Sequence, residues 1–506
     1  MVIMADFVQT FTHFNHAQRQ QALTLLTAEL TPYEWRYLHA LTNSRSFQLD
    51  IIGRLPIELV AHIFTHLDPA APYRFQIVST RWRYILQSLP VLKAGLNSWY
   101  QGVANPSDFE HDTLCQRAAR RIHRFRTGRP LGIYKITSDE QIACPSLLGD
   151  YLVWLSGTPQ TSPMRVACIF NLQNWDLGHV AGEAREQLIN LVLSDQIVVL
   201  VTAANMCYVY ELPTLSQRKK FRVPSASYLQ NVTCRRSTVA CLASLDMHIS
   251  VFIWDYNTQR GTSFTISHDS DMFLSTHGPR GLLHIAPLVQ PESETIILMF
   301  VMDTPTETPN QTLFVCARYT FRGHCVSSFS PSLPELRPLL VWHGVTPFVP
   351  VDDSGNVFAA RVNTTNPNSQ PPNASIVSLL LRFDTKTNDL RVWEDPIHRS
   401  NSPRGINDYR ASWWKDTWYG FHPSVETKNI ITFMGTQDKA ACIPISSDPY
   451  SEVTNVNIPT EPLFVHERYV VRVMSENIYL LCFHGSFVRP TMGCTSFMNG
   501  TIRVLS

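Results

Sequence analysis

The N-terminal part of the chain places its apolar residues at helical spacing. Leu23, Leu26 and Leu30 follow one another at steps of three and four residues, which puts them on one side of an α-helix. Pro32 suits the start of a second helix, because the N–H that proline lacks would have no partner in the first turn. The pattern predicts a helical lead-in segment over residues 1–49.

A further group of short helices is predicted directly after this segment. Pro56 precedes an apolar stripe with a period of four residues, and Ser79 is a suitable N-cap for a later helix. Helices this short cannot bury so many apolar side chains among themselves. We therefore expect a partner or a neighbouring domain to cover part of their apolar face. The residues concerned are Leu55, Leu59, Ile63, Phe64, Leu67, Val78 and Trp82.

The order of these residues resembles a family signature. The F-box is matched, without a gap, by Leu55-Pro56-x-Glu58-Leu59-Val60-x-x-Ile63-Phe64-x-x-Leu67-Asp68-Pro69 and then Val78-Ser79-x-Arg81-Trp82-Arg83-x-Ile85. The resemblance covers residues 50–95 and implies docking on the Skp-type adaptor of SCF ubiquitin ligases. Carried over by position, the adaptor contacts that it implies are Leu55, Pro56, Leu59, Ile63, Leu67, Val78 and Trp82.

The chain departs from the family pattern at one place. F-boxes usually carry an acidic residue and leucines just after the Asp-Pro pair, where this chain has Ala70-Ala71-Pro72-Tyr73. The apolar and helix-starting roles are kept, but the charge is lost. The lead-in before the signature also resembles, more loosely, that of fungal F-box proteins. The fold that the resemblance implies is unchanged by this difference.

Basic residues crowd the segment that follows, residues 96–139. Leu114, Ala118, Ile122 and Phe125 recur among them at helical spacing and are predicted to face inward. We interpret the segment as a helical linker whose arginines are solvated and pair with nearby acids. A phosphate- or nucleic-acid-binding patch is the alternative. The basic residues are Arg117, Arg120, Arg121, His123, Arg124, Arg126 and Arg129.

From about residue 140 the helical period fades, and short apolar runs alternate with turn residues, as in β-strands. The runs come in packets whose turns, near Asp150, Asp195 and Arg236, are about 40 to 45 residues apart, the repeat length of propeller blades. We count seven packets, with six or eight left open. Residues 501–505 form a last strand that helps to close the ring. A pair of β-sandwiches is the alternative, but a closed ring better explains so many short strands.

The predicted fold class is therefore α+β and multidomain, with a helical F-box region in front of an all-β, WD-repeat-like propeller. Trp254-Asp255 ends a strand as in WD repeats, although no regular Gly-His signature accompanies it. F-boxes and propellers also often occur in one chain. The predicted domains are residues 1–49, 50–95, 96–139 and 140–506.

Composition limits the expected partners and the expected location of the protein. The chain has 506 residues, 44% of them hydrophobic and 16% charged, and a net charge of +1. This balance supports a large core and gives no general attraction to nucleic acid or to a membrane. The chain shows neither a secretory signal nor an apolar stretch of membrane length, so we expect it in the cytoplasm, the nucleus or both.

The sequence gives no sign of a metal site, a cofactor or a catalytic residue. The 11 cysteines include no Cys-x-x-Cys pair, and His62 and His66 lack a nearby third ligand. There is also no phosphate loop, nucleophile elbow or dinucleotide fingerprint. Six cysteines in apolar runs are expected to be buried in strands. They are Cys168, Cys207, Cys241, Cys316, Cys442 and Cys482.

These patterns predict a non-catalytic, substrate-recognition subunit of an SCF-type ubiquitin ligase. Its F-box would bind the Skp-type adaptor, and through it a cullin, while its propeller would bind an unknown target protein. Two alternatives stay open: a scaffold that binds the adaptor without recruiting a cullin, and an enzyme built on the propeller. Many F-box propellers bind phosphorylated segments through arginines on the ring face, and the candidates here are Arg165, Arg235, Arg236, Arg280, Arg382 and Arg404.

Overall fold

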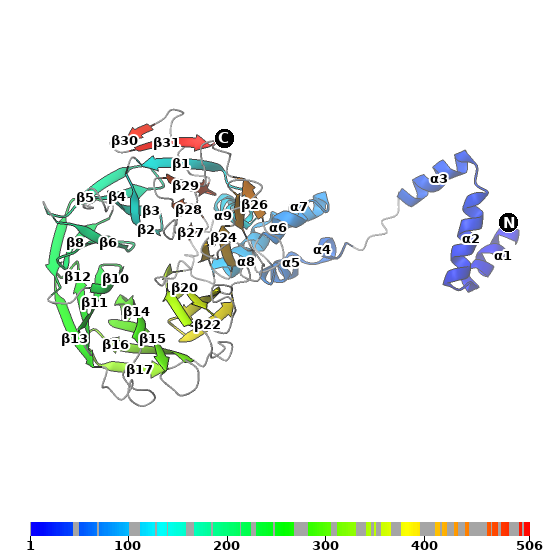
Figure 1. The fold of residues 1–506 in the computed structure, drawn as a ribbon. Helices are drawn as coiled ribbons and strands as arrows, with labels where there is room; N and C mark the ends of the chain where they lie inside the picture. Colours follow the sequence, from blue (N-terminus) through cyan, green and yellow to red (C-terminus); the bar gives the residue numbers. More distant parts are fainter. Residues whose placement is uncertain are drawn as a thin grey trace. The chain divides into compact units, whose positions relative to one another are not determined.

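The chain forms two compact units, Met1–Gly95 and Leu96–Ser506, in the computed structural model. The first unit is helical, and the second consists mainly of β-sheet (Figure 1). Among the residues described, no helix is both long enough and apolar enough to cross a membrane. The structure describes residues 2–43, 50–67, 70–100, 112–126, 129–138, 140–157, 166–183, 186–212, 214–223, 229–245, 248–267, 282–304, 311–329, 341–345, 349–350, 356–365, 376–394, 410–414, 417–421, 430–433, 441–444, 463–466, 468–473, 477–484, 495–497 and 500–505.

The helices of the first unit begin where the sequence supplies caps. Asn15 and Gln18 form a capping box in which each side chain accepts a hydrogen bond from the other residue's backbone N–H. Ser79 accepts a hydrogen bond from the backbone N–H of Trp82, which confirms it as an N-cap. The helices are α1 (Val2–His13), α2 (His16–Ala28), α3 (Pro32–Asn43), α4 (Ile51–Arg54), α5 (Ile57–Thr65), α6 (Ala71–Phe75), α7 (Thr80–Leu86) and α8 (Leu89–Tyr100), the last of which continues into the second unit.

The lead-in helices and the later helices differ in what they bury. No residue of α2 or α3 is buried, so these two helices hold no core of their own. Helices α4 to α8 enclose a small apolar core, against which Leu55, Ile57, Trp82 and Ile85 also pack. The core residues are Ile52, Val60, Phe64, Ala71, Leu86 and Val91.

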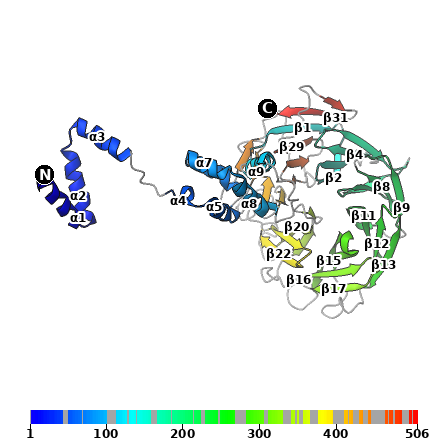
Figure 2. The ribbon, with the colours of Figure 1, turned by 180° about the vertical axis from the view of Figure 1, so that it is seen from behind.

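Four sheets of the second unit each contain four consecutive antiparallel strands, arranged side by side around a ring (Figures 1 and 2). Their strands are β2 (Ile142–Leu148), β3 (Tyr151–Ser156), β4 (Val166–Asn171) and β5 (Leu177–Ala181); β6 (Leu188–Leu193), β7 (Ile197–Thr202), β8 (Met206–Glu211) and β9 (Arg218–Arg222); β10 (Leu229–Arg235), β11 (Thr238–Leu245), β12 (His248–Asp255) and β13 (Gly261–Ser267); and β14 (Leu282–Gln290), β15 (Thr295–Thr304), β16 (Gln311–Thr320) and β17 (Cys325–Phe329).

The ring continues through a fifth sheet and closes in a sixth. The fifth contains β18 (Val341–Val345), β19 (Val349–Pro350), β20 (Val357–Thr365), β21 (Ile376–Asp384) and β22 (Asp389–Glu394). The sixth contains β27 (Leu463–Val465), β28 (Tyr469–Val473), β29 (Asn477–Cys482), β1 (Gly132–Ser138), β31 (Gly500–Leu505) and β30 (Thr495–Phe497).

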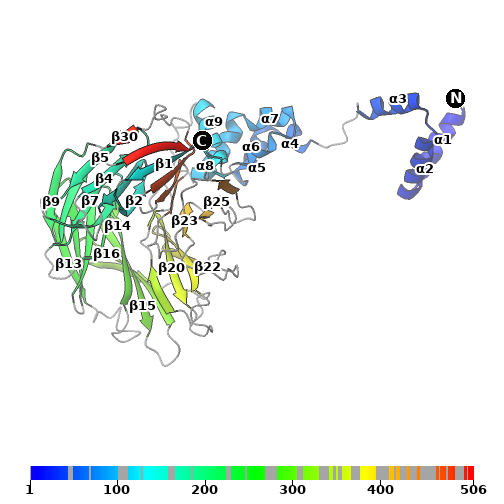
Figure 3. The ribbon, with the colours of Figure 1, turned by 45° about the horizontal axis from the view of Figure 1, so that its top comes forward.

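The sixth sheet joins the two ends of the β-rich region. Strand β1 pairs with β29 on one side, where Tyr134 lies opposite Leu480. On its other side β1 pairs with β31, where Tyr134 lies opposite Val504 (Figure 3). This pairing confirms that a C-terminal strand helps to close the ring. A closed ring leaves no unpaired first and last sheet, and the arrangement is that of a β-propeller.

The described residues form six blades of four or more strands, so the expected number of seven is wrong and the alternative of six holds. Strands β23 (Arg410–Trp414) and β24 (Thr417–Phe421) form a sheet of two, as do β25 (Ile430–Phe433) and β26 (Ala441–Pro444). A count of apolar packets predicts strands but not the ladders between them. The packet over residues 409–445 was counted as a blade, but its strands β23 to β26 pair only two by two, which is why the blade number was missed.

The propeller core lies between neighbouring sheets. Every residue of β7 is buried, because both of its faces are covered. One cluster joins β7 and β8 to the neighbouring strands β11 and β12, and includes Val199, Cys241 and Trp254. Burial is confirmed for five of the six cysteines expected in strands, while the side chain of Cys442 lies outside what the structure describes. The five are Cys168, Cys207, Cys241, Cys316 and Cys482.

Helix α9 (Asp112–Arg126) carries the arginine-rich segment and belongs to the second unit. Ala118, Ile122 and Phe125 are buried, as predicted. The ring of Phe125 meets that of Phe483, from the segment after β29, edge-on at 5.4 Å. Leu114 is exposed, so its predicted inward position is wrong; Cys115 takes that place on the buried face. The helix therefore uses its apolar face to pack on the propeller unit.

Candidate protein-interaction surfaces

Asp50 organises the start of the helical group α4 to α8. Its Oδ1 accepts a 2.7 Å hydrogen bond from the backbone N–H of Gly53, which caps α4. The same oxygen accepts a 2.6 Å hydrogen bond from Nε1 of Trp82 in α7. The Gly53 N–H, followed by the Trp82 indole, lowers the pKa of Asp50. One carboxylate thus joins the start of α4 to a residue of α7 that lies 32 positions further along the chain.

Three aromatic rings hold α5, α6 and α7 together. The ring of Phe75 lies edge-on to those of Phe64 and Trp82, at centroid distances of 6.5 and 6.2 Å. Phe64 is fully enclosed, whereas Phe75 and Trp82 lie at the boundary of the core. These contacts set the positions from which the remaining apolar side chains of α5 and α7 project.

Several apolar side chains of this helical group face solvent. Leu59 is 50% exposed and Val78 54% exposed, although both are large apolar residues. Ile63, on the α5 stripe with Leu59, is also exposed, and so is Leu67, which follows the helix. Isolated apolar residues are common on surfaces, but several exposed within one short helical segment are typical of an interaction site.

The structure separates the seven predicted contact residues into two groups. Five are exposed: Pro56, Leu59, Ile63, Leu67 and Val78. Leu55 and Trp82 are half-buried and also pack against the small core, and the indole N–H of Trp82 is used by Asp50. A partner could reach the five exposed residues without any rearrangement of the helices.

Sequence reasoning missed part of this apolar surface. Ile77 is 85% exposed and Tyr84 82% exposed, and neither was among the expected contacts. Ile51 and Phe75 are exposed as well. Ile77 lies in the turn before α7 and Tyr84 on the side of α7 away from the core, so no helical stripe includes them. One signal could have found them. They are apolar residues outside the buried stripe of a helix, where polar residues are expected.

Two histidines lie close together at the end of α5. The rings of His62 and His66 stand edge-on with centroids 5.0 Å apart, and both are exposed. Within the part of the chain that the structure describes, no group of three or more His, Cys, Asp or Glu residues could hold a metal ion.

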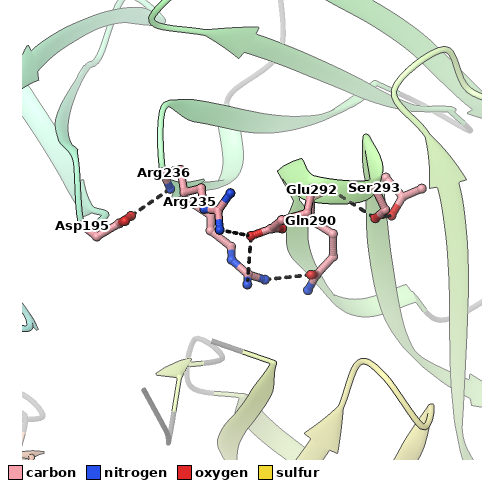
Figure 4. A network of polar contacts seen from close by, with 7 residues as sticks. Asp195, Arg235, Arg236, Gln290, Glu292 and Ser293 are labelled. Atoms are coloured by element: carbon pink, nitrogen blue, oxygen red, sulfur yellow. Dashed lines mark hydrogen bonds and ion pairs between the residues drawn. The ribbon is translucent and has the colours of Figure 1, made fainter. Parts of the chain in front are cut away.

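A second candidate surface lies on the turns of the propeller. Arg235 and Arg236 both approach Oε1 of Glu292, at 3.5 and 3.0 Å (Figure 4). Arg235 also donates a 2.7 Å hydrogen bond to Gln290. The backbone N–H of Arg236 donates to Asp195 at 3.0 Å. The network therefore joins the turns β6–β7, β10–β11 and β14–β15, which belong to three blades.

The backbone of Arg236 also takes part in this network. It has a φ of 50°, the left-handed conformation that non-glycine residues seldom adopt. Its carbonyl accepts a 2.6 Å hydrogen bond from Ser194, so both backbone groups face the neighbouring blade. A similar link occurs elsewhere on the ring, where Arg468 reaches Asp150 at 3.0 Å. Charged contacts between turns thus recur from blade to blade.

The six arginine candidates for target binding differ in their surroundings and in whether the structure describes them. Arg235 and Arg236 are adjacent and share one acidic partner. Arg382 lies on β21 and is half-buried. Three of the candidates, Arg165, Arg280 and Arg404, lie outside the described residues.

Comparison with known families supports the helical signature. Residues 52–94 match the F-box domain. The comparison with curated proteins found no match. The chain therefore carries an F-box domain followed by a β-propeller.

Solved structures that resemble the chain do so distantly. One is the crystal structure of the mitotic checkpoint complex, with a TM-score of 0.38, 7% identity, and coverage of 70% of this chain and 91% of that one. Another is Sqt1 from Saccharomyces cerevisiae, with a TM-score of 0.38, 10% identity, and coverage of 69% and 97%. A third is the β-propeller domain of the Trilobed protease from Pyrococcus furiosus, with a TM-score of 0.39, 9% identity, and coverage of 70% and 98%. Likenesses this weak carry no information about ligand or partner.

Proposed function

We propose that this protein is a substrate-recognition subunit of an SCF-type E3 ubiquitin ligase. The exposed apolar residues of the F-box domain would bind a Skp-type adaptor, and the adaptor would connect them to a cullin. The observation that carries this proposal is the exposure of Leu59, Ile63 and Val78 within a domain that matches the F-box. Such a surface is favourable only when a partner covers it.

The propeller would supply the second half of the function. We infer that it binds a target protein and holds it close to the ubiquitin-loaded conjugating enzyme, so that transfer becomes effectively intramolecular. The turn face around Arg236 supports this role, because the Arg236 side chain is exposed at the point where the turns of three blades meet. The protein itself would do no covalent chemistry, and this role places it in the cytoplasm or the nucleus.

Co-purification with a Skp-type adaptor tests the proposal. Leu59→Asp with Ile63→Asp places charges where the surface is apolar and exposed, so adaptor binding should be lost while the fold is kept. Val326→Asp is the matched control, because Val326 is 58% exposed on the propeller strand β17. A wild type that retains no adaptor, or a double variant that retains as much, refutes the proposal.

A scaffold that binds the adaptor outside a ligase would behave differently in the same experiment. It would retain the adaptor but no cullin, and its removal would leave the lifetime of every bound protein unchanged. Measuring the cullin-to-adaptor ratio in the purified complex separates the two functions. We expect cullin to be present in proportion to adaptor.

A further inference from the structure

The basic side chains of this chain are strongly biased toward arginine. Of 42 lysines and arginines, eight are lysine and 34 are arginine. Residues 1–134 contain a single lysine, Lys93, although they contain 13 arginines. The eight lysines are Lys93, Lys135, Lys219, Lys220, Lys386, Lys415, Lys428 and Lys439.

Pairing explains only part of this bias. Arginine is superior to lysine where its planar fork meets a carboxylate or stacks on a ring. Arg235 and Arg236 use this property at Glu292. In contrast, among the residues described, Arg222, Arg260 and Arg322 are exposed and make no ion pair or side-chain hydrogen bond. A lysine would supply the same charge at these three positions, so another property must distinguish them.

Three of the five described lysines have their amino groups engaged, and a fourth, Lys93 on α8, is half-buried. Nζ of Lys219 donates a 2.8 Å hydrogen bond to the carbonyl of Tyr256 and lies 3.9 Å from the centre of its ring. Nζ of Lys220 pairs with Glu183 at 2.5 Å, and that of Lys135 lies over the Tyr479 ring. Lys386 differs, because its side chain is exposed in the turn between β21 and β22.

Lysine and arginine differ in their ability to accept ubiquitin. The uncharged ε-amine of a lysine attacks the carbonyl carbon of the thioester between the C-terminus of ubiquitin and a cysteine of the conjugating enzyme. A C–N bond forms, the C–S bond breaks, the thiolate leaves, and the nitrogen gives up a proton. A small fraction of exposed lysine is uncharged near neutral pH, since its usual pKa is about 10.4, and proton loss to a base can supply more of this form. The guanidinium of arginine stays protonated and delocalised, so it cannot act as the acceptor.

We propose that the replacement of lysine by arginine over this surface protects the protein from ubiquitination in its own complex. The inference rests on the proposed function, because only a chain held beside a loaded conjugating enzyme requires such protection. Surface charge, and with it solubility, is kept, while the acceptor groups are removed. The lysines of a bound target then become the favoured acceptors. Among the described lysines, Lys386 is the one that we expect to accept ubiquitin.

The experiment uses the full chain, reconstituted with adaptor, cullin and its RING subunit, ubiquitin, ATP, and the activating and conjugating enzymes. Complex formation is measured first, and the rate of ubiquitin attachment to the protein second. The test variant, Arg222→Lys with Arg260→Lys and Arg322→Lys, keeps every charge and adds three exposed amines. The matched control changes the same arginines to glutamine, which removes charge without adding an acceptor.

We expect the lysine variant to be modified several-fold faster than the wild type, with ubiquitin mapped by mass spectrometry to positions 222, 260 and 322. The glutamine control should match the wild type. Equal rates for the wild type and the lysine variant overturn the inference while the assembled complex still supports the proposed function. Failure of the complex to form overturns both, and the first measurement shows which has happened. Residual attachment at Lys219 in preference to Lys386 also contradicts the assignment of the exposed acceptor.

Discussion

Oδ1 of Asp50 accepts a 2.6 Å hydrogen bond from Nε1 of Trp82, and this contact joins the start of α4 to α7. Asp50 also caps α4 through Gly53. A side chain on Gly53 would collide with this carboxylate, because an added Cβ would lie 2.1 Å from Oδ2. The apolar surface of the F-box domain therefore depends on a polar contact that lies beside it.

We expect the stability contributed by Asp50 to depend on pH. Hydrogen bonds lower its pKa in the folded state, first that from Gly53 and then that from Trp82. A lowered pKa stabilises the fold above the unfolded-state pKa of about 3.9, and that contribution is lost as the pH falls through the folded value. The denaturant midpoint of the wild type should therefore exceed that of Asp50→Ala at pH 7 and approach it in acid.

Asp50→Asn is the control for this titration. Asparagine keeps an acceptor oxygen for both donors but does not ionise in this range. Its midpoint difference from Asp50→Ala should stay constant with pH. A wild-type advantage that grows in acid would contradict the assignment.

Phe64 and Leu59 occupy the same helix but should respond oppositely to truncation. Phe64 is 2% exposed in the small core, so Phe64→Ala should cost about 3–5 kcal/mol of stability in denaturant unfolding. Leu59→Ala should cost about 0.5 kcal/mol, because the side chain faces solvent. Adaptor affinity should instead fall for Leu59→Ala, by about 2 kcal/mol or roughly 30-fold, if it is a central contact.

Titration calorimetry with purified adaptor measures the second effect. An adaptor affinity unchanged by Leu59→Ala, in a protein of unchanged stability, would remove Leu59 from the proposed surface. A large loss of stability would instead show that Leu59 is a core residue.

The turn network of the propeller predicts a small, salt-sensitive coupling between blades. Arg236 and Glu292 are 3.0 Å apart, and both side chains are well exposed. A double-mutant cycle with Arg236→Ala and Glu292→Ala should give about 0.5 kcal/mol at low salt, because exposed ion pairs are screened. The coupling should approach zero in 1 M salt. A coupling that persists at high salt would contradict the assignment of an exposed, screened ion pair.

Thiol labelling should report the integrity of the propeller core. Burial raises the pKa of Cys168, Cys316 and Cys482 to about 12, so they are protonated and shielded at pH 8. Cys325 is exposed on β17 and should react with iodoacetamide in the native protein. Mass spectrometry after native and denatured labelling distinguishes the two classes. Native reaction of the buried three, at the rate of Cys325, would contradict the described packing.

The sequence by itself determined the helical region well. Helix formation depends on neighbours three and four residues away, so the stripe of Leu59, Ile63 and Leu67 and the cap at Ser79 were visible without a structure. The turns at Asp150, Asp195 and Arg236 were found for the same reason, since turn residues act locally. Burial of the strand cysteines followed from the apolar runs around them.

Only the tertiary structure decided what joins distant parts of the chain. Pairing of β1 with β29 and β31 spans the whole propeller, and no local pattern specifies such a ladder. The same limit explains the blade number, and the exchange of Leu114 for Cys115 on the buried face of α9. The exposure of Ile77 and Tyr84 was likewise decided by how α5, α6 and α7 assemble. Local periodicity shows that a residue is apolar on a helix or strand, whereas only packing shows whether another part of the molecule covers it.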